Sequence, residues 1–176
     1  MSLEFIKKME YLDNIEYGWV DKYGVIHRKS GRDFYIANYH LQSPDETLKY
    51  KVGTCWDQVE LIRYYAKEVG VEVETYIIIY DVDGKIARHT FAVTCENDKF
   101  YLLEDSRNGS GIVEYSSLKE ILESFITKFP QMYGINNFDK NKIEIYRYDT
   151  PKVGLSYDEF TEYVRSCKEV HLKNEE

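Results

Sequence analysis

Apolar residues recur at steps of three and four over residues 54 to 69, which predicts an amphipathic helix. The repeating positions are Val59, Ile62, Ala66 and Val69. Thr54 and Asp57 stand three residues apart at the start of this segment, as in a capping box. Gly70 follows the last apolar position, where a glycine is typical of the residue just beyond a helix end.

Beyond Gly70 the apolar period changes from 3.6 to 2, which predicts strands. Three alternating segments follow one another: "EVETYIIIY" (72–80), "IARHTFAVTC" (86–95) and "KFYLLEDS" (99–106). The turn sequences "DVDGK" and "END" separate them, and "RNGSGI" (107–112) is interpreted as a loop. Strands joined by such short connections form an antiparallel β-meander.

Helical segments and one more strand surround the meander. Before it we predict a short helix at 3–12, a small hairpin over "YGWVDKYGVIH", and a short helix at about 44–50 capped by "SPDE". After it we predict a helix over 116–129 that stops before Pro130, a strand over 142–148 and a helix over 156–170. Residues 28 to 43 are polar and aromatic and receive no helix or strand. This order predicts one α+β domain over residues 1–176, rather than a repeating βαβ chain.

Composition and charge exclude several classes of function. The 176 residues are 43% hydrophobic, enough for a sizeable core, and the net charge of −8 argues against a binder of nucleic-acid phosphates. No segment has the roughly 20 consecutive apolar residues of a membrane span, so we expect no membrane partner. Three widely spaced cysteines without a CxxC motif indicate free thiols and a cytoplasmic location.

Cys55 would be the first residue of the helix if Thr54 is its cap. Backbone N–H groups at a helix N-terminus have no intrahelical partner, and the helix dipole there favours negative charge. That position lowers the pKa of a thiol from about 8.5 and offers donors for an oxyanion. Asp57 is a counter-argument, because a second anion in the same turn disfavours a thiolate unless its carboxylate points away.

His89 and Asp105 could complete a catalytic triad with Cys55. A histidine suits the role of general base and then acid, and a carboxylate would orient its ring. Strand register decides whether the two meet. A three-residue loop at Glu96–Asp98 would place His89 opposite Asp105, whereas a two-residue loop would pair His89 with Ser106 and turn Asp105 to the other face.

Each of these residues also has a purely structural interpretation. Cys55 lies in phase with the apolar stripe of its helix, and a buried cysteine is usually a small hydrophobic residue. Cys95 and Cys167 are interpreted as packing thiols. The dispersed histidines lack the spacing of a zinc site, so we predict no metal and no cofactor.

"GTCWD", "HTFAV" and "FYLLEDS" together resemble the transglutaminase-like superfamily, a papain-like group that includes cysteine peptidases and amidases, here a small bacterial branch. The resemblance covers residues 43–116. It implies a papain-like core with the nucleophile helix packed on an antiparallel sheet, with Cys55 as nucleophile, His89 as base and acid, and Asp105 as the orienting residue. Because this chain has "EDS" at the third motif, Glu104 is a rival for that role. Gln42 and Trp56 are candidates for the oxyanion donor.

The resemblance and the residues together predict a thiol acyl-transfer enzyme that hydrolyses a peptide or amide bond in a peptide or protein substrate. Two alternatives stay open. One is transfer of the acyl group to an amine, as in a transglutaminase. The other is a binding module that keeps the fold without catalysis, with tyrosines serving as contacts. The sequence specifies neither the substrate nor the oligomeric state.

Overall fold

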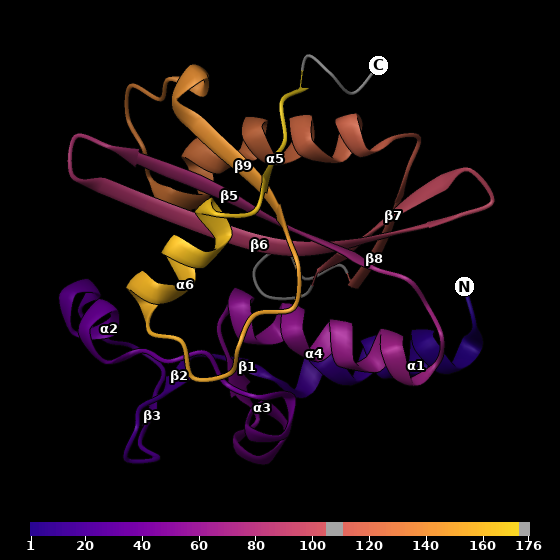
Figure 1. Cartoon of the computed structure of the whole chain (residues 1–176), viewed down its shortest axis with the longest axis horizontal. Helices are drawn as coiled ribbons and strands as arrows, with labels where there is room; N and C mark the ends of the chain where they lie inside the picture. Colours follow the sequence, from indigo (N-terminus) through magenta and orange to yellow (C-terminus); the bar gives the residue numbers. More distant parts are fainter. Residues whose placement is uncertain (105–110, 173–176) are drawn as a thin grey trace.

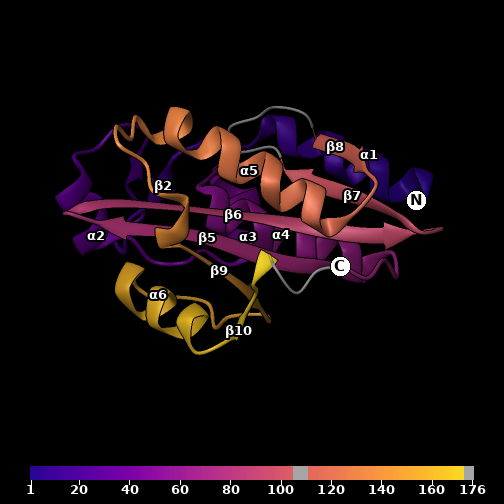
Figure 2. The same ribbon diagram turned by 90° about the horizontal axis from the view of Figure 1, so that it is seen from above.

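A computed structural model describes residues 1–104 and 111–172. Its centre is a six-stranded sheet in the order β10-β9-β5-β6-β7-β8, with antiparallel pairing throughout. Helix α5 covers one face of this sheet, and α4 lies on the other face with α1 beside it (Figures 1 and 2). The predicted α+β class, with the helix after Gly53 packed on an antiparallel meander, is confirmed.

The meander supplies the four strands β5 (Glu74–Val82), β6 (Lys85–Glu96), β7 (Lys99–Glu104) and β8 (Gly111–Tyr115). Glu96 pairs with Lys99, so the β6–β7 turn has two residues, Asn97 and Asp98. Both have positive φ, 53° and 60°, which is the backbone of a type I′ hairpin turn. The shorter of the two loop alternatives is therefore the one that forms, and the three-residue "END" turn is wrong.

The helices and short strands predicted before the meander are present. The capping boxes of Ser43 with Glu46 and of Thr54 with Asp57 are both formed. The first half of the chain contains α1 (Leu3–Tyr11), a 3-10 turn (Leu12–Asn14), β1 (Glu16–Tyr17), β2 (Trp19–Val20), β3 (Ile26–His27), α2 (Arg32–Asn38), α3 (Pro44–Tyr50), β4 (Val52–Gly53) and α4 (Cys55–Glu68). The last part contains α5 (Leu118–Tyr133), a 3-10 turn (Lys140–Lys142), β9 (Ile143–Tyr148), α6 (Tyr157–Arg165) and β10 (Lys168–Glu169).

Two boundaries near the C-terminus differ from the prediction. Helix α5 runs through Pro130 to Tyr133 and ends at Gly134, whose φ is +60°. Pro130 lies in the last turn of α5, and its carbonyl accepts the N–H of Ile135 at the helix end. The last helix ends at Arg165 rather than near residue 170, and the chain then adds β10 to the edge of the sheet at β9.

Besides the two-residue strands β1, β4 and β10 and the two 3-10 turns, helix α2 and strand β8 have no counterpart in the sequence prediction. Helix α2 forms within the stretch of residues 28 to 43, and none of its residues is fully buried, so it carries no strong apolar stripe. Strand β8 begins at Gly111 within the predicted loop and continues to Tyr115. Its residues are half-buried or exposed, which is typical of an edge strand with a weak alternation.

The core is divided by the sheet. Ile77, Ile78 and Ile79 are all fully buried because both faces of β5 are covered. Ile78 packs with α5, whereas Ile77 and Ile79 pack with the N-terminal part of α4 and with α6. The start of α4 is thus held firmly against the middle of the sheet. None of the helices in residues 1–104 and 111–172 is both long and apolar enough to cross a membrane.

Candidate functional site

The start of α4 presents Cys55 to the sheet. The first bond inside the helix runs from the N–H of Gln58 to the carbonyl of Thr54, at 3.0 Å. The backbone N–H groups of Cys55 and Trp56 therefore lie ahead of the intrahelical ladder. Cys55 is the first helical residue, as predicted, and only 6% of it is exposed. The helix end thus brings a buried thiol and amide donors that have no intrahelical partner to one place.

Strand β6 meets the Cys55 thiol from the other side. Pairing of β6 with β7 covers Ala92 to Glu96, and Cys55 lies against the earlier part of β6, at His89 and Thr90. The backbone N–H of Thr90 and the imidazole of His89 both lie close enough to the thiol to lower its pKa. The structure therefore brings together two of the three residues that the sequence proposed as a triad.

Glu104, at the end of β7, is the carboxylate that contacts His89. Nε2 of the imidazole lies 2.9 Å from Oε1 of Glu104, and the two side chains are 0% and 2% exposed. The two-residue turn explains why Glu104 faces His89, because it pairs Leu102 with Val93. Positions 104 and 89 then fall on the same face of the sheet as that pair. Glu104 was the rival for the orienting role. Asp105 lies outside the described residues.

For both Cys55 and His89, burial and pairing shift the pKa in opposite directions. Burial alone would raise the pKa of the Cys55 thiol, but contact with His89 and the donors of Thr90 outweigh it, so the pKa is lowered. Burial alone would lower the pKa of His89, yet the thiolate of Cys55 and the carboxylate of Glu104 raise it to about 9. Both shifts favour a thiolate beside an imidazolium over a neutral pair.

The contacts of His89 are close but not ideally aligned. Neither ring nitrogen has a partner of good hydrogen-bond geometry among the described residues. Catalytic hydrogen bonds are often loose before a substrate binds and tighten afterwards. With Nε2 facing Glu104, Nδ1 is the ring nitrogen left for Cys55.

Asp57, the counter-argument to a thiolate, points away from Cys55. Its Oδ1 accepts the hydroxyl of Tyr39 at 2.8 Å and the N–H of Gln42 at 2.9 Å. Its Oδ2 accepts the N–H of Thr54 at 2.8 Å and the hydroxyl of the same residue at 2.9 Å. The carboxylate is committed to capping, so it does not compete with the thiolate for the helix end.

The two candidates for the oxyanion donor have other roles. Trp56 is buried, stacks on Tyr157 with ring centroids 5.0 Å apart, and packs at a tilt against Phe160 at 4.3 Å. The amide Nε2 of Gln42 donates to Oγ1 of Thr47 at 3.2 Å and to the carbonyl of Val52 at 2.8 Å. The amide of Gln42 is therefore engaged elsewhere, whereas Trp56 lines the cavity in front of Cys55 and stays a candidate.

The other cysteines lie apart from the site. Cys95 is exposed on β6, and the thiol of Cys167 lies 3.4 Å from the carbonyl of Tyr163. Within residues 1–104 and 111–172, no three His, Cys, Asp or Glu side chains are grouped closely enough to hold a metal ion.

A cavity of about 390 Å³ opens onto Cys55. Its wall includes Tyr35 of α2, whose phenol is in electrostatic contact with the Cys55 thiol; burial raises the pKa of that phenol well above its usual value. Tyr35 therefore stays protonated and able to donate a hydrogen bond. Sequence reasoning missed this residue because the helix that carries it has no strong apolar period.

Comparison with known proteins adds little to this geometry. No protein-family model and no curated protein matches the chain. The solved catalytic domain of the Salmonella virulence factor SseI is similar over 76% of this chain and 76% of that chain, with 15% identity and a TM-score of 0.35. A likeness of that size carries no argument about activity. The function must therefore be argued from the site itself.

Proposed function

We propose that the protein is a thiol-dependent acyl-transfer enzyme, in which Cys55 is the nucleophile, His89 the general base and acid, and Glu104 the orienting carboxylate. The observation that carries this proposal is the buried contact of Cys55 with His89 beside an open cavity, with the pKa of the thiol lowered and that of the imidazole raised. A structural cysteine in an apolar core has the opposite shift.

The chemistry follows from these positions. The Cys55 thiolate attacks the carbonyl carbon of a peptide or amide, forming a carbon–sulfur bond and an oxyanion. Collapse of that intermediate breaks the carbon–nitrogen bond, and the His89 imidazolium gives its proton to the departing amine. Neutral His89 then takes a proton from water, whose oxygen attacks the thioester. The carboxylic acid leaves, and its departure restores the thiolate and imidazolium.

Two features of the site support stabilisation of the oxyanion. The N–H groups of Cys55 and Trp56 precede the intrahelical ladder of α4, at the positive end of the helix dipole. Tyr35 supplies a protonated phenol on the cavity wall. The backbone donors at the helix end were expected from the sequence, and Tyr35 joins Gln42 and Trp56 as a candidate side-chain donor.

The resemblance to the transglutaminase-like superfamily stays part of the proposal. It is supported by the order of the elements: a cysteine opening a helix, a histidine on one strand and a carboxylate at the end of the next. An amine could replace water as the acceptor of the acyl group, and the outcome depends on how well the cavity excludes water. All three cysteines are free, which supports a reducing, cytoplasmic location.

Alkylation by iodoacetamide near pH 6 tests the proposal, with mass spectrometry to assign the modified residue. Cys55 should react selectively, whereas exposed Cys95 and partly buried Cys167 act as internal references. A His89→Ala variant should slow labelling of Cys55 by about a hundredfold, because an ordinary thiol is mostly protonated at that pH. Equal, slow labelling of all three cysteines would instead leave a catalytically silent binding module of this fold.

A further inference from the structure

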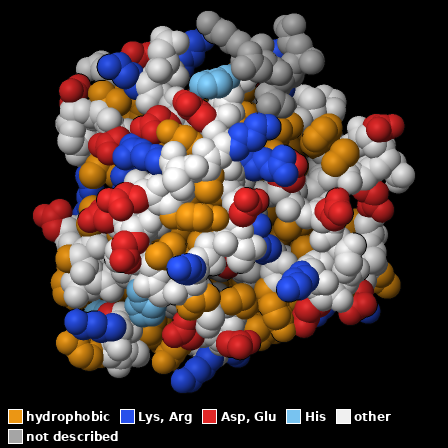
Figure 3. Space-filling model, viewed as in Figure 1, with side chains coloured by type: hydrophobic (Ala, Val, Ile, Leu, Met, Phe, Trp, Pro, Cys, Tyr) orange, Lys and Arg blue, Asp and Glu red, His pale blue; other side chains and the backbone are white. Residues whose placement is uncertain are grey.

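The cavity in front of Cys55 differs in charge from the rest of the chain. The protein carries a net charge of −8, and acidic and basic side chains are interspersed over the face drawn in Figure 3. The described residues that line the cavity, in contrast, include no Asp or Glu but four cations: Arg28, Lys29, Arg32 and Arg88. A positive cavity beside a nucleophile indicates selection for an anionic group on the substrate.

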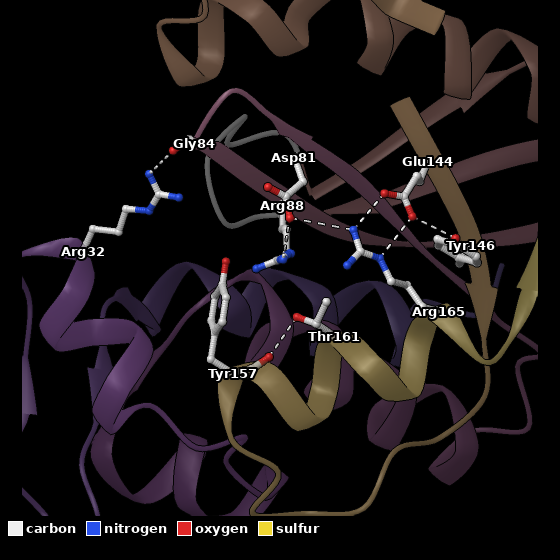
Figure 4. A network of polar contacts seen from close by, with 9 residues as sticks. All are labelled: Arg32, Asp81, Gly84, Arg88, Glu144, Tyr146, Tyr157, Thr161 and Arg165. Carbon is white, nitrogen blue, oxygen red and sulfur yellow. Dashed lines mark hydrogen bonds and ion pairs between the residues drawn. The ribbon is translucent and has the colours of Figure 1, made fainter. Parts of the chain in front are cut away.

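Three of these cations are ordinary surface groups. Arg28 pairs with Glu16, and both side chains are more than half exposed, at 57% and 60%. Arg32 reaches across from α2 and donates to the carbonyl of Gly84 at 3.4 Å (Figure 4). Lys29 is exposed. Water can solvate each of them, so their presence alone does not define a site.

Arg88 is different, because its side chain is only 6% exposed and the carboxylate paired with it, Asp81, lies beyond hydrogen-bonding distance. The hydroxyl of Tyr157 also contacts the guanidinium. Nε and Nη1 have no hydrogen-bond partner among the described residues. Nη2 lies 3.7 Å from Oδ2 of Asp81, too far for a hydrogen bond, and Arg165 shares that carboxylate at 3.9 Å. A guanidinium buried with unused donors is destabilising unless a ligand satisfies them.

The ring of Tyr157 fixes where the guanidinium lies. Arg88 extends from β6 toward α6 and its guanidinium carbon lies 4.7 Å from the centroid of that ring (Figure 4). A cation held over an aromatic face is pre-oriented, so little entropy is lost when it binds a planar anion. Arg88 also directly precedes His89 in the chain, and it lines the same cavity as Cys55.

We propose that Arg88 binds a carboxylate of the substrate, next to the acyl group that Cys55 attacks. This inference rests on the proposed function and adds a substrate class: a peptide or amide that carries a free carboxylate, from either a C-terminus or an acidic side chain. The flat guanidinium matches a carboxylate and donates charge-assisted hydrogen bonds to it.

A pair of alkylating agents tests this directly. Iodoacetate and iodoacetamide both react when the thiolate displaces iodide from carbon, and they differ in the carboxylate. The ratio of their rates at Cys55 therefore cancels any change in thiolate content. We expect Cys55 to prefer iodoacetate, with saturation, whereas Cys95 does not. Arg88→Gln should lower the ratio at Cys55 by at least about tenfold.

Matched variants separate Arg88 from the other cations. Arg28→Gln removes a charge from the same cavity wall and should leave the ratio within about twofold, because an exposed ion pair contributes little. Arg88→Lys keeps the charge without the planar fork, and should recover only part of the preference. An unchanged ratio in folded Arg88→Gln, or an equal loss in Arg28→Gln, would overturn the assignment.

Protection of Cys55 from iodoacetamide identifies the source of the carboxylate, at constant ionic strength. The probes are one acetylated dipeptide with a free C-terminus, its C-terminal amide, and a dipeptide amide with an internal glutamate. Protection by either carboxylate-bearing probe supports the proposal and identifies its source. Equal protection by the neutral amide or by inorganic phosphate would overturn it. If Cys55 does not react with iodoacetamide near pH 6, the proposed function itself fails, independently of Arg88.

Discussion

Cys55 and Asp57 stand two residues apart at the start of the same helix, and both are buried side chains that can carry a negative charge. Asp57 accepts four hydrogen bonds from fixed donors, and its surroundings are closed. Cys55 faces a titratable partner, His89, and an open cavity. One helix end thus holds an anion that serves structure and an anion poised for chemistry.

The difference lies in what satisfies each charge. Burial raises the pKa of Asp57 to about 6, even though backbone and hydroxyl donors oppose the rise. For Cys55 a second ionisable group overcomes burial and lowers the pKa. A fixed donor cannot take part in proton transfer, whereas an imidazole can give and take a proton. Cys55 and Asp57 therefore have different roles because their partners differ, although both lie at the same end of the helix.

Removal of the thiol should give the largest effect and sharpen the comparison. Cys55→Ala should abolish turnover and labelling at this position, a loss on the order of a thousandfold or more. The free energy of unfolding should change by only about 1 kcal/mol, because the cost of burying the thiolate offsets much of what its contacts with His89 and Thr90 contribute. Activity and urea denaturation, measured on the same variant, check both parts. A variant that unfolds as readily as one lacking Asp57 would assign Cys55 a structural role.

Removal of the Asp57 carboxylate should have the opposite profile. Asp57→Asn loses acceptors for the N–H and hydroxyl of Thr54, and should destabilise the fold by about 2–3 kcal/mol at pH 7. Urea denaturation measures this loss. In the fraction that stays folded, the labelling rate of Cys55 should be nearly unchanged. Loss of Cys55 labelling without loss of stability would contradict a purely structural role for Asp57.

The orienting carboxylate gives a smaller effect. Glu104→Gln should slow turnover by about tenfold and lower the pKa of His89, because the imidazolium loses its charged partner. The pH–rate profile should lose activity on its alkaline side at a lower pH. Asp105→Asn is the matched control and should leave the profile unchanged. A larger effect from Asp105→Asn would indicate that Asp105, rather than Glu104, orients His89.

The pH dependence of stability gives the smallest effect. Because the pKa of Asp57 is raised in the folded state, its contribution is fully present below the unfolded value of 3.8 and is lost as pH rises through about 6. Between pH 4 and 7 the free energy of unfolding of the wild type should therefore fall more steeply than that of Asp57→Asn. Urea denaturation at several pH values measures the slopes, and parallel slopes would contradict the raised pKa.

The sequence predicted those elements whose pattern is strong. The amphipathic helix after Gly53, its capping box and the alternating strands are local features, and all three formed. Helix α2 and strand β8 escaped prediction because their residues are half-exposed and lack a clear period. The predicted end of α5 was wrong because α5 continues through Pro130.

The residues of the site also differ in how far the sequence could predict them. Cys55 and His89 could be proposed from residue type and position, but the carboxylate depended on the length of a turn. One residue fewer in the β6–β7 loop places Glu104 on the face of His89. Arg88, Tyr35 and Tyr157 come from three different elements, and only the folded chain brings them to one cavity. Long-range packing, which no local pattern records, determines that part of the site.

Direct titration of the buried pair is the sharpest test of the central claim. Thiolate absorbance near 240 nm, taken as the difference between wild type and Cys55→Ser, reports the Cys55 charge, and NMR of the imidazole ring reports the His89 charge. A thiolate should form below the usual thiol pKa, beside an imidazolium that persists until about pH 9. A neutral imidazole beside a thiol that ionises only above about pH 8.5 would contradict it.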